Sequence, residues 1–182
     1  MAAKTIVYQV SLRLTDSLRQ RDLSREFSLI RNPAEKLERM MLRLIAWVLF
    51  ADDALCFNYN ASSANEPELW IKDSNQDIKL WITIGLPNEK ILNQSCNRAE
   101  QVVLFTQHDK AALQWKKHTL HKLDSLQNLM VINISDEVLH SAAQMVQASM
   151  NIEVQIQDGQ LSFSVNGNRL LIEPQTWKID SF

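Results

Sequence analysis

The chain has 182 residues, of which 46% are hydrophobic and 22% are charged, and its formal net charge at pH 7 is −2. This composition is typical of a globular protein with a sizeable core. It excludes an intrinsically disordered chain and a strongly basic protein that coats DNA. Only three glycines occur, Gly85, Gly159 and Gly167, and they cannot build the glycine-rich phosphate loops of Rossmann dehydrogenases or P-loop NTPases.

The two cysteines, Cys56 and Cys96, are not spaced like the ligands of a zinc ribbon or the half-cystines of a disulfide framework. Two small buried side chains in a reducing compartment are the simpler interpretation. The first residues lack the apolar stretch of a secretory signal peptide, and no run of about 18 apolar residues would span a membrane. The sequence therefore predicts a cytoplasmic protein without a membrane partner.

The first predicted elements are a hairpin and a helix. Apolar and polar residues alternate over residues 6–14, which predicts a strand with one buried face, and residues 25–31 are expected to pair with it. The clearest helix follows. Asn32 is its predicted cap, Pro33 its first residue and Glu35 the capping-box acid, and apolar residues continue at helical spacing to about residue 49.

The middle of the chain alternates between strands and helices. The predicted elements are strands at 68–72 and 78–85, a helix at 88–98, a strand at 101–105, a helix at 110–120, a strand at 129–134 and a helix at 135–150. The continuous apolar runs of QVVLF (101–105) and LMVINI (129–134) are typical of strands covered on both faces, so we expect these two to be parallel neighbours.

The C-terminal part changes back to period-two alternation. Asp158-Gly159 and Asn166-Gly167 separate short alternating runs at 152–156, 161–165 and 170–172, which predicts a three-stranded meander. The meander is expected at one edge of the sheet or as a separate layer. No linker or repeat divides the sequence, so we predict a single domain over residues 1–182 with a mixed α/β (α+β) fold.

Glu38 is the most unusual residue in the chain, because a helical wheel places it among the apolar residues Met41, Leu42 and Ile45. A carboxylate there costs free energy unless it is paired, protonated or bound to a metal. The alternative is that Glu38 lies in the first turns of its helix, where the dipole favours an anion and its stem can reach an arginine or the surface.

Glu66 and Glu68 lie in the EPELW segment at the start of a predicted strand. Acids at such positions are usually solvated. With the acid on the preceding helix, however, they can bring carboxylates from different elements to one divalent cation, and Mg²⁺ uses only one or two carboxylates with water and phosphate.

The stretch WKKHTLHK is the most basic part of the chain. His118 and His121 are three residues apart on a predicted helix end and so share a face, as zinc ligands can, but no third ligand is evident. The lysines of this region are Lys110, Lys116, Lys117 and Lys122. They can contact a phosphate backbone, although a solvated helix face is the simpler interpretation.

Five segments are distinctive together. They are RNPAEKLERMMLRLIAWVLFAD, EPELW, LWITIGLPNEK, RAEQVVLFT and VQIQDGQLSFS. In this order, over nearly the whole chain, they resemble the YaeQ family of small bacterial proteins, which looks like a variant of the PD-(D/E)XK nuclease fold. The resemblance implies a mixed central β-sheet flanked by helices, with a restriction-endonuclease-like core and an added C-terminal β-meander.

The resemblance also implies a site in which acids from a helix and two strands hold Mg²⁺ or Mn²⁺ and a lysine assists the attacking water. Glu38 matches the helix acid and Glu68 the first-strand acid, and we expect their carboxylates within about one water of each other. Thr83 stands where the family usually carries Glu or Asp, and Gly85 stands where a standard nuclease has its lysine. Lys90, in the next helix, is the candidate replacement for that lysine.

The favoured function follows from these departures. Thr83 neutralises no metal charge, so we expect a degenerate metal site on a nuclease-like scaffold that acts as a binding or regulatory module for a protein or nucleic acid. The alternative is an Mg/Mn-dependent phosphodiesterase acting on nucleic acid, in which the metal activates water and stabilises charge on the phosphate.

Overall fold

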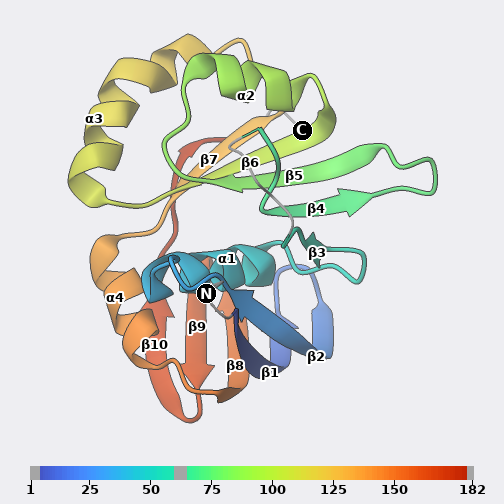
Figure 1. The fold of residues 1–182 in the computed structure, drawn as a ribbon, viewed down its shortest axis with the longest axis vertical. Coiled ribbons are helices and arrows are strands. Elements are labelled where there is room, and N and C mark those ends of the chain that lie inside the picture. The colour runs from blue at the N-terminus through green and yellow to red at the C-terminus, as the bar shows by residue number, and fades with distance from the viewer. Residues whose placement is uncertain (1–4, 60–64, 180–182) are drawn as a thin grey trace. The chain divides into compact units, whose positions relative to one another are not determined.

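The computed structural model describes residues 5–59 and 65–179. The chain divides into two compact units, and each unit combines two separate stretches of sequence. Unit 1 comprises Met1–Val48 and Glu137–Pro174, and unit 2 comprises Leu49–Asp136 and Gln175–Phe182. Each unit contains one mixed β-sheet with helices (Figure 1).

The sheet of unit 1 has the strand order β10-β9-β8-β1-β2. Its strands are β1 (Ile6–Asp16), β2 (Arg21–Arg31), β8 (Ser149–Gln157), β9 (Gln160–Val165) and β10 (Asn168–Ile172). β1 and β2 form the predicted antiparallel hairpin, and β2 begins four residues earlier than expected. The predicted meander is confirmed as β8, β9 and β10, and β8 runs parallel to β1. The meander therefore extends the N-terminal hairpin into one sheet.

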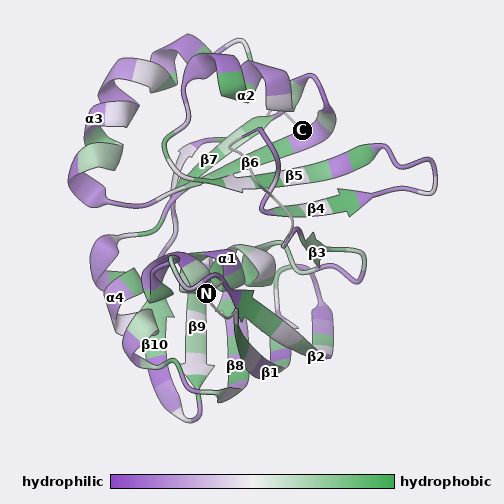
Figure 2. Ribbon diagram, viewed as in Figure 1, coloured by the Kyte–Doolittle hydropathy of each residue, from purple (hydrophilic) through white to green (hydrophobic). Residues whose placement is uncertain are grey.

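Alternation in the sequence produces one buried face on this sheet. Every second residue of β8 is buried, and Val10, Leu12 and Leu14 of β1 are buried in the same way. Figure 2 shows the alternation of hydrophilic and hydrophobic residues along β8. Since side chains of a strand point to opposite faces in turn, this pattern fixes the register that β8 can adopt beside β1.

Helix α1 (Leu37–Leu49) begins later than predicted. Pro33 lies in a turn, where the Asn32 side chain accepts a hydrogen bond from the backbone N–H of Ala34 at 3.0 Å. The backbone N–H of Met40 donates to the carbonyl of Lys36, so Lys36 precedes the first helical residue. The capping-box prediction for Glu35 is wrong, because its carboxylate is held by an arginine further along the helix.

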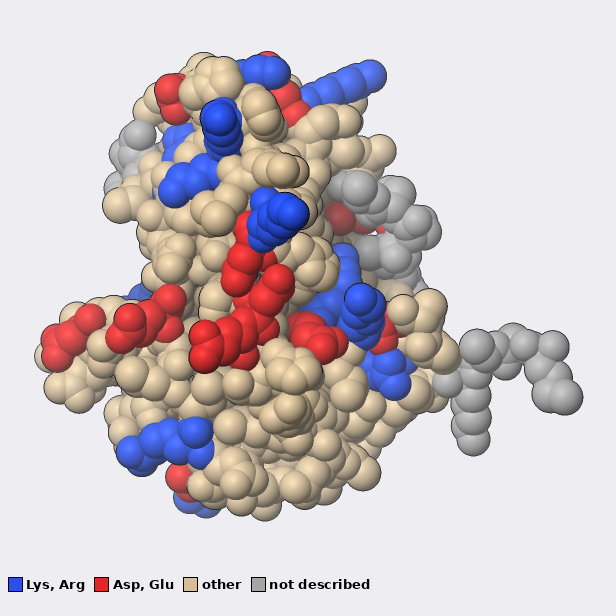
Figure 3. All heavy atoms as spheres, turned by 90° about the vertical axis from the view of Figure 1, so that its left-hand side faces the viewer, with Lys and Arg blue, Asp and Glu red and all other residues tan. Residues whose placement is uncertain are grey.

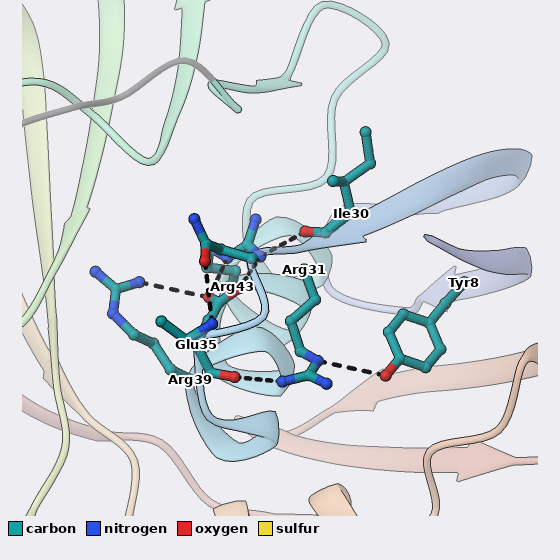
Figure 4. A network of polar contacts seen from close by, with 8 residues as sticks. Tyr8, Ile30, Arg31, Glu35, Arg39 and Arg43 are labelled. Carbon is teal, nitrogen blue, oxygen red and sulfur yellow. Dashed lines mark hydrogen bonds and ion pairs between the residues drawn. The ribbon is translucent and has the colours of Figure 1, made fainter. Parts of the chain in front are cut away.

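That arginine is Arg43, which is 5% exposed and therefore needs a counter-charge. Its Nε and Nη2 donate to the two carboxylate oxygens of Glu35 at 2.9 and 2.6 Å, and Nη2 also donates to the carbonyl of Ile30 at 2.8 Å (Figure 4). Arg31 donates to the carbonyl of Glu35 and, at 3.4 Å, to the hydroxyl of Tyr8. The network ties the start of α1 to the β1–β2 hairpin.

Helix α4 (Asp136–Gln144) is shorter than the predicted helix at 135–150. Leu139 and Ala142 are its fully buried residues, and the chain turns after Gln144 to enter β8 at Ser149. The correction arises because Met150, although compatible with a helix, is a buried β8 residue next to Val10 of β1.

The sheet of unit 2 has the order β11-β7-β6-β5-β4-β3. Its strands are β3 (Cys56–Phe57), β4 (Leu69–Lys72), β5 (Ile78–Ile84), β6 (Ala99–Thr106), β7 (Leu129–Asn133) and β11 (Gln175–Lys178). β5, β6 and β7 are parallel, which confirms that QVVLF and LMVINI are parallel neighbours. The edge strands β3 and β11 were not predicted, because their short segments carry no clear periodicity.

Two helices and a 3₁₀ turn pack on this sheet: α2 (Glu89–Cys96), α3 (Asp109–Thr119) and η1 (Leu120–Leu123). Asn88 caps α2, since its side chain accepts a hydrogen bond from the N–H of Ile91 at 3.0 Å. The apolar cluster beneath the helices contains Trp81, Leu92, Cys96, Val102, Leu104, Leu123, Leu129 and Val131. Both apolar strand runs thus contribute to one core.

Cys96 lies in this cluster, and burial raises the pKa of its thiol to about 11, although Lys178 opposes the rise. The pKa of this thiol in the folded protein exceeds its ordinary value of 9.0, so the thiol lowers stability as pH rises between about 9 and 11 and has no such effect below 9. Because the thiolate is the reactive form, we expect maleimide to modify exposed Cys56 quickly and Cys96 only after unfolding. Peptide mass spectrometry of the labelled native protein checks this, and equal labelling rates would contradict the buried position of Cys96.

The predicted mixed α+β class is confirmed, with the strands distributed over two mixed sheets where one central sheet was expected. In the part of the chain that the structure describes, no helix is long and apolar enough to cross a membrane.

Candidate functional site

Glu38 lies in the first turn of α1 and is half-exposed, with its side chain at 38% of full accessibility. Its Oε1 is 3.6 Å from Nδ1 of His140 on α4. The neighbouring residues from Met40 to Val48 are all buried, so the helical wheel was right that this helix is mainly apolar. Glu38 itself reaches the surface of unit 1 beside a histidine.

Glu38 and His140 border a hollow of about 410 Å³ that lies wholly within unit 1. Its other lining residues are Lys36, Leu37, Ala143 and Gln144. The second ring nitrogen of His140 is 3.0 Å from the side-chain amide nitrogen of Gln144, so neighbours on two sides hold the imidazole. A carboxylate beside an imidazole can share a proton or supply two ligands to a cation. Because His140 is 67% exposed, the pair adds little to stability.

Glu68 and Thr83 come close together in unit 2, at one end of the β4–β5 pair. The antiparallel register of β4 and β5 ends at the pair of Leu69 and Ile82, and Glu68 lies just before β4. The backbone N–H of Glu68 donates to the carbonyl of Ile82 at 2.8 Å, and Thr83 is the next residue of β5. This bond is one residue out of the register of the strand pair, as in a β-bulge, so Glu68 is not set opposite Thr83. The structure therefore brings these two predicted site residues near each other along the backbone but does not place them on one face of the sheet.

Thr83 is 7% exposed, and its neighbour on β6 is the fully buried Leu104. Trp81, two residues earlier on β5, lies in the apolar cluster and therefore on the same face. This environment is mainly apolar and suits a neutral hydroxyl better than a carboxylate.

Gly85 follows β5 with a φ of +132°, a conformation that a side-chain-bearing residue rarely adopts. Its N–H donates to the carbonyl of Phe105 at 2.9 Å, so the adjacent strand holds this backbone. A lysine at position 85 is incompatible with the observed backbone without strain. The absence of the nuclease lysine here thus has a conformational cause.

Lys90 is exposed in the first turn of α2. Leu92, which packs into the cluster under the helix, is two residues away, and this spacing corresponds to about 200° around the helix axis. Lys90 is therefore on the solvent side of α2, facing away from the sheet that carries Glu68 and Thr83. The role of Lys90 as the replacement lysine therefore stays a prediction. The position of Lys90 on the solvent side of α2 does not favour that role.

Glu38 belongs to unit 1, whereas Glu68, Thr83 and Lys90 belong to unit 2. The predicted approach of Glu38 to Glu68, and with it the Mg²⁺ or Mn²⁺ site, stays a prediction. Within residues 5–59 and 65–179, no three His, Cys, Asp or Glu side chains are grouped so that they could hold a metal ion. His118 and His121, both exposed, thus lack a third ligand there.

The sequence analysis did not identify a polar cluster at the carboxyl ends of β6 and β7, where open parallel sheets commonly bind ligands. Thr106 and Asn133 are buried, and the threonine hydroxyl donates to the asparagine carbonyl oxygen at 2.8 Å. Gln107 is 7% exposed, and its Oε1 has no hydrogen-bond partner among the described residues. Polar residues directly after each apolar strand were the signal in the sequence.

Two aspartates occupy the helix starts at the same edge. The carboxylate of Asp136 accepts hydrogen bonds from the N–H groups of His108 and Asp109, at 2.9 and 3.1 Å. Asp109 in turn accepts one from the N–H of Asp136 at 3.2 Å. The first two N–H donors at the start of α3 are therefore already used by a carboxylate.

Comparison with known proteins gives one consistent result. The model of the YaeQ protein family matches residues 1–174. The uncharacterised protein YaeQ of Escherichia coli strain K12 is 34% identical over 178 residues, which are 98% of either chain, and its counterpart in Salmonella typhi is 35% identical over the same lengths.

Two solved structures agree with these matches. The crystal structure of YaeQ from Xanthomonas axonopodis pv. citri has a TM-score of 0.92 and 30% identity, covering 96% of this chain and 99% of the other. The Pseudomonas syringae YaeQ structure has a TM-score of 0.89 at 24% identity, with 97% of each chain covered, and supports the fold alone. The segments that suggested this resemblance lie on α1, β4, β5, β6, β8 and β9. The chain belongs to the YaeQ family.

Proposed function

We propose that this protein is a nuclease-like scaffold whose metal site is degenerate and that it acts in the cytoplasm as a binding or regulatory module. The observation that carries the proposal is the β5 segment around Thr83 and Gly85. Thr83 supplies no charge and is buried beside Leu104, and the backbone at Gly85 disfavours a lysine. A phosphodiesterase of this type needs charge at both positions to hold the metal and stabilise the phosphate.

The state of the cysteines supports the cytoplasmic part of the proposal. Cys56 is exposed and Cys96 buried, and both are free thiols. An exposed free thiol is compatible with a reducing compartment, where disulfides are rare.

A cleavage assay tests the proposal directly. Supercoiled DNA, single-stranded DNA and RNA are incubated with the unmodified protein in Mg²⁺ or Mn²⁺, and calorimetry measures metal binding with and without the nucleic acids. We expect no cleavage above the background of the metal buffer, because the β5 segment lacks the required charges.

Three variants make the assay specific. Glu38→Gln and Glu68→Gln each remove one implied metal ligand, and Glu153→Gln makes the same change at an exposed β8 residue as a matched control. Metal-dependent cleavage that disappears in either ligand variant but persists in the control would overturn the proposal in favour of the Mg/Mn-dependent phosphodiesterase.

A further inference from the structure

The outer face of α3 and η1 carries an ordered stripe of side chains. Its members are Leu113, Lys116, Lys117, Leu120, His121 and Asp124, and together they line an open hollow of about 450 Å³ in unit 2. The first four stand at positions i, i+3, i+4 and i+7 of one helical face. We call this set the α3 face.

The α3 face combines apolar contact area with positive charge. Leu113 is 58% exposed, although the adjacent Ala112 of the same helix is fully buried. Lys116 lies with its Nζ 4.6 Å from the ring centroid of Trp177, so a cation–π contact restrains that ammonium group. Lys117 is exposed next to it. Figure 3 views the side of the molecule on which α3 lies and shows basic side chains there, with acidic side chains nearby and uncharged surface between them.

These properties favour an acidic peptide over a nucleic acid as the occupant. The hollow is lined mostly by apolar atoms, and its lining contains no Phe, Tyr or Trp ring on which a base could stack. Leucine side chains flanked by ammonium groups instead complement a segment with an apolar anchor and neighbouring carboxylates.

We infer that the α3 face is a docking surface for an acidic protein segment that inserts an apolar side chain between Leu113 and Leu120 and sets its carboxylates against Lys116 and Lys117. This inference rests on the proposed function as a binding module, and it specifies the chemical class of the partner that the module binds. From Leu113 to His121 the face spans about 12 Å at 1.5 Å per residue, so roughly four residues of an extended peptide cover it.

A selection experiment tests the inference without a known partner. A phage-displayed library of random peptides, each about ten residues long and so longer than the face requires, is selected against the full-length protein. We expect the enriched peptides to contain at least one Leu, Ile or Phe with Asp or Glu at neighbouring positions. A synthetic copy of an enriched peptide is then titrated by fluorescence anisotropy.

Single substitutions on the α3 face should weaken this binding about tenfold, or ~1.4 kcal/mol. Leu113→Ser removes the exposed apolar contact and Lys117→Glu reverses the charge, and both positions are exposed enough that folding is unaffected. Arg169→Glu on β10 is the matched control, an exposed cation reversed in unit 1, and it should leave the affinity unchanged.

Three outcomes would overturn the inference: no enriched peptide class, enrichment of basic peptides, or equal binding by the control and both α3 variants. A fourth outcome would also overturn the inference: the protein binds single-stranded RNA or DNA in place of peptides, and Lys117→Glu weakens that binding. This result would assign the α3 face to phosphate recognition.

A failed peptide selection in a protein without nuclease activity removes only this inference, whereas metal-dependent cleavage removes the proposed function itself.

Discussion

Arg43→Ala is expected to lower the free energy of unfolding by about 3–5 kcal/mol, because it removes the hydrogen-bonded partner of a buried ion pair and leaves Glu35 with only the longer contact to the more exposed Arg39. The Glu35 carboxylate is only 10% exposed and receives two hydrogen bonds from Arg43. The Ile30 carbonyl also loses the hydrogen bond from Arg43 in this variant. Urea denaturation followed by circular dichroism measures the change.

Arg39→Ala is the matched control for this prediction. Arg39 contacts the same carboxylate at 3.8 Å but is 33% exposed, so its removal should cost less than about 1 kcal/mol. The double variant Glu35→Ala/Arg43→Ala should be less destabilised than the sum of its two single variants, since it leaves no charge unpaired. A loss below about 1 kcal/mol for Arg43→Ala would mean that water or Arg39 replaces the missing partner.

Thr83→Glu is expected to have two large and opposite effects. Without metal, it introduces a carboxylate beside Leu104 at a position that is 7% exposed. Burial can raise the pKa of a carboxyl by about 3 units, which corresponds to roughly 4 kcal/mol of lost stability at neutral pH. Because the folded pKa would exceed the unfolded one, this loss should shrink as pH falls toward about 4.

With metal, the new carboxylate would lie on β5 next to Ile82, whose carbonyl accepts the backbone hydrogen bond of Glu68. We expect Thr83→Glu to bind Mn²⁺ at least about tenfold more tightly than the unmodified protein, a gain of ~1.4 kcal/mol. Thermal denaturation with and without Mn²⁺ reports both effects together. Glu68→Gln should cancel the gain, and Glu38→Gln tests whether the helix carboxylate shares the site.

Thr83→Val is the control that separates metal binding from packing, because it has nearly the same shape without charge. It should be far less destabilised than Thr83→Glu and should not respond to Mn²⁺. Equal Mn²⁺ affinity for Thr83→Glu and the unmodified protein would show that position 83 does not face a cation site.

Sequence patterns were sufficient where an element's residues have only one favourable arrangement. The alternation in β1 and β8 admits one buried face, and the Asp-Gly and Asn-Gly turns fix the hairpins between β8, β9 and β10. The continuous apolar runs of β6 and β7 likewise require cover on both faces, and these strands are parallel neighbours as expected.

Local rules failed where a distant residue competed for the same group. Glu35 has the spacing of a capping box, yet its carboxylate bonds to Arg43, whose buried charge makes that pairing more favourable than a helix cap. Residues 145–150 are compatible with a helix, but Met150 instead takes part in β8. Neither competition is visible within a window of a few residues.

The properties of the candidate site likewise fall into two groups, those given by residue identity and those given by tertiary contacts. The sequence by itself determined the family, the chemical character of Glu38, Glu68 and Thr83, and the missing lysine at Gly85, because these are properties of residue identity and order. Only the tertiary structure decided that the backbone of Glu68 bonds to β5 beside Thr83, that Glu38 neighbours His140 and that Lys90 turns to solvent. Those outcomes depend on strand register and on which helix side is buried, and both are set by contacts between segments far apart in the chain.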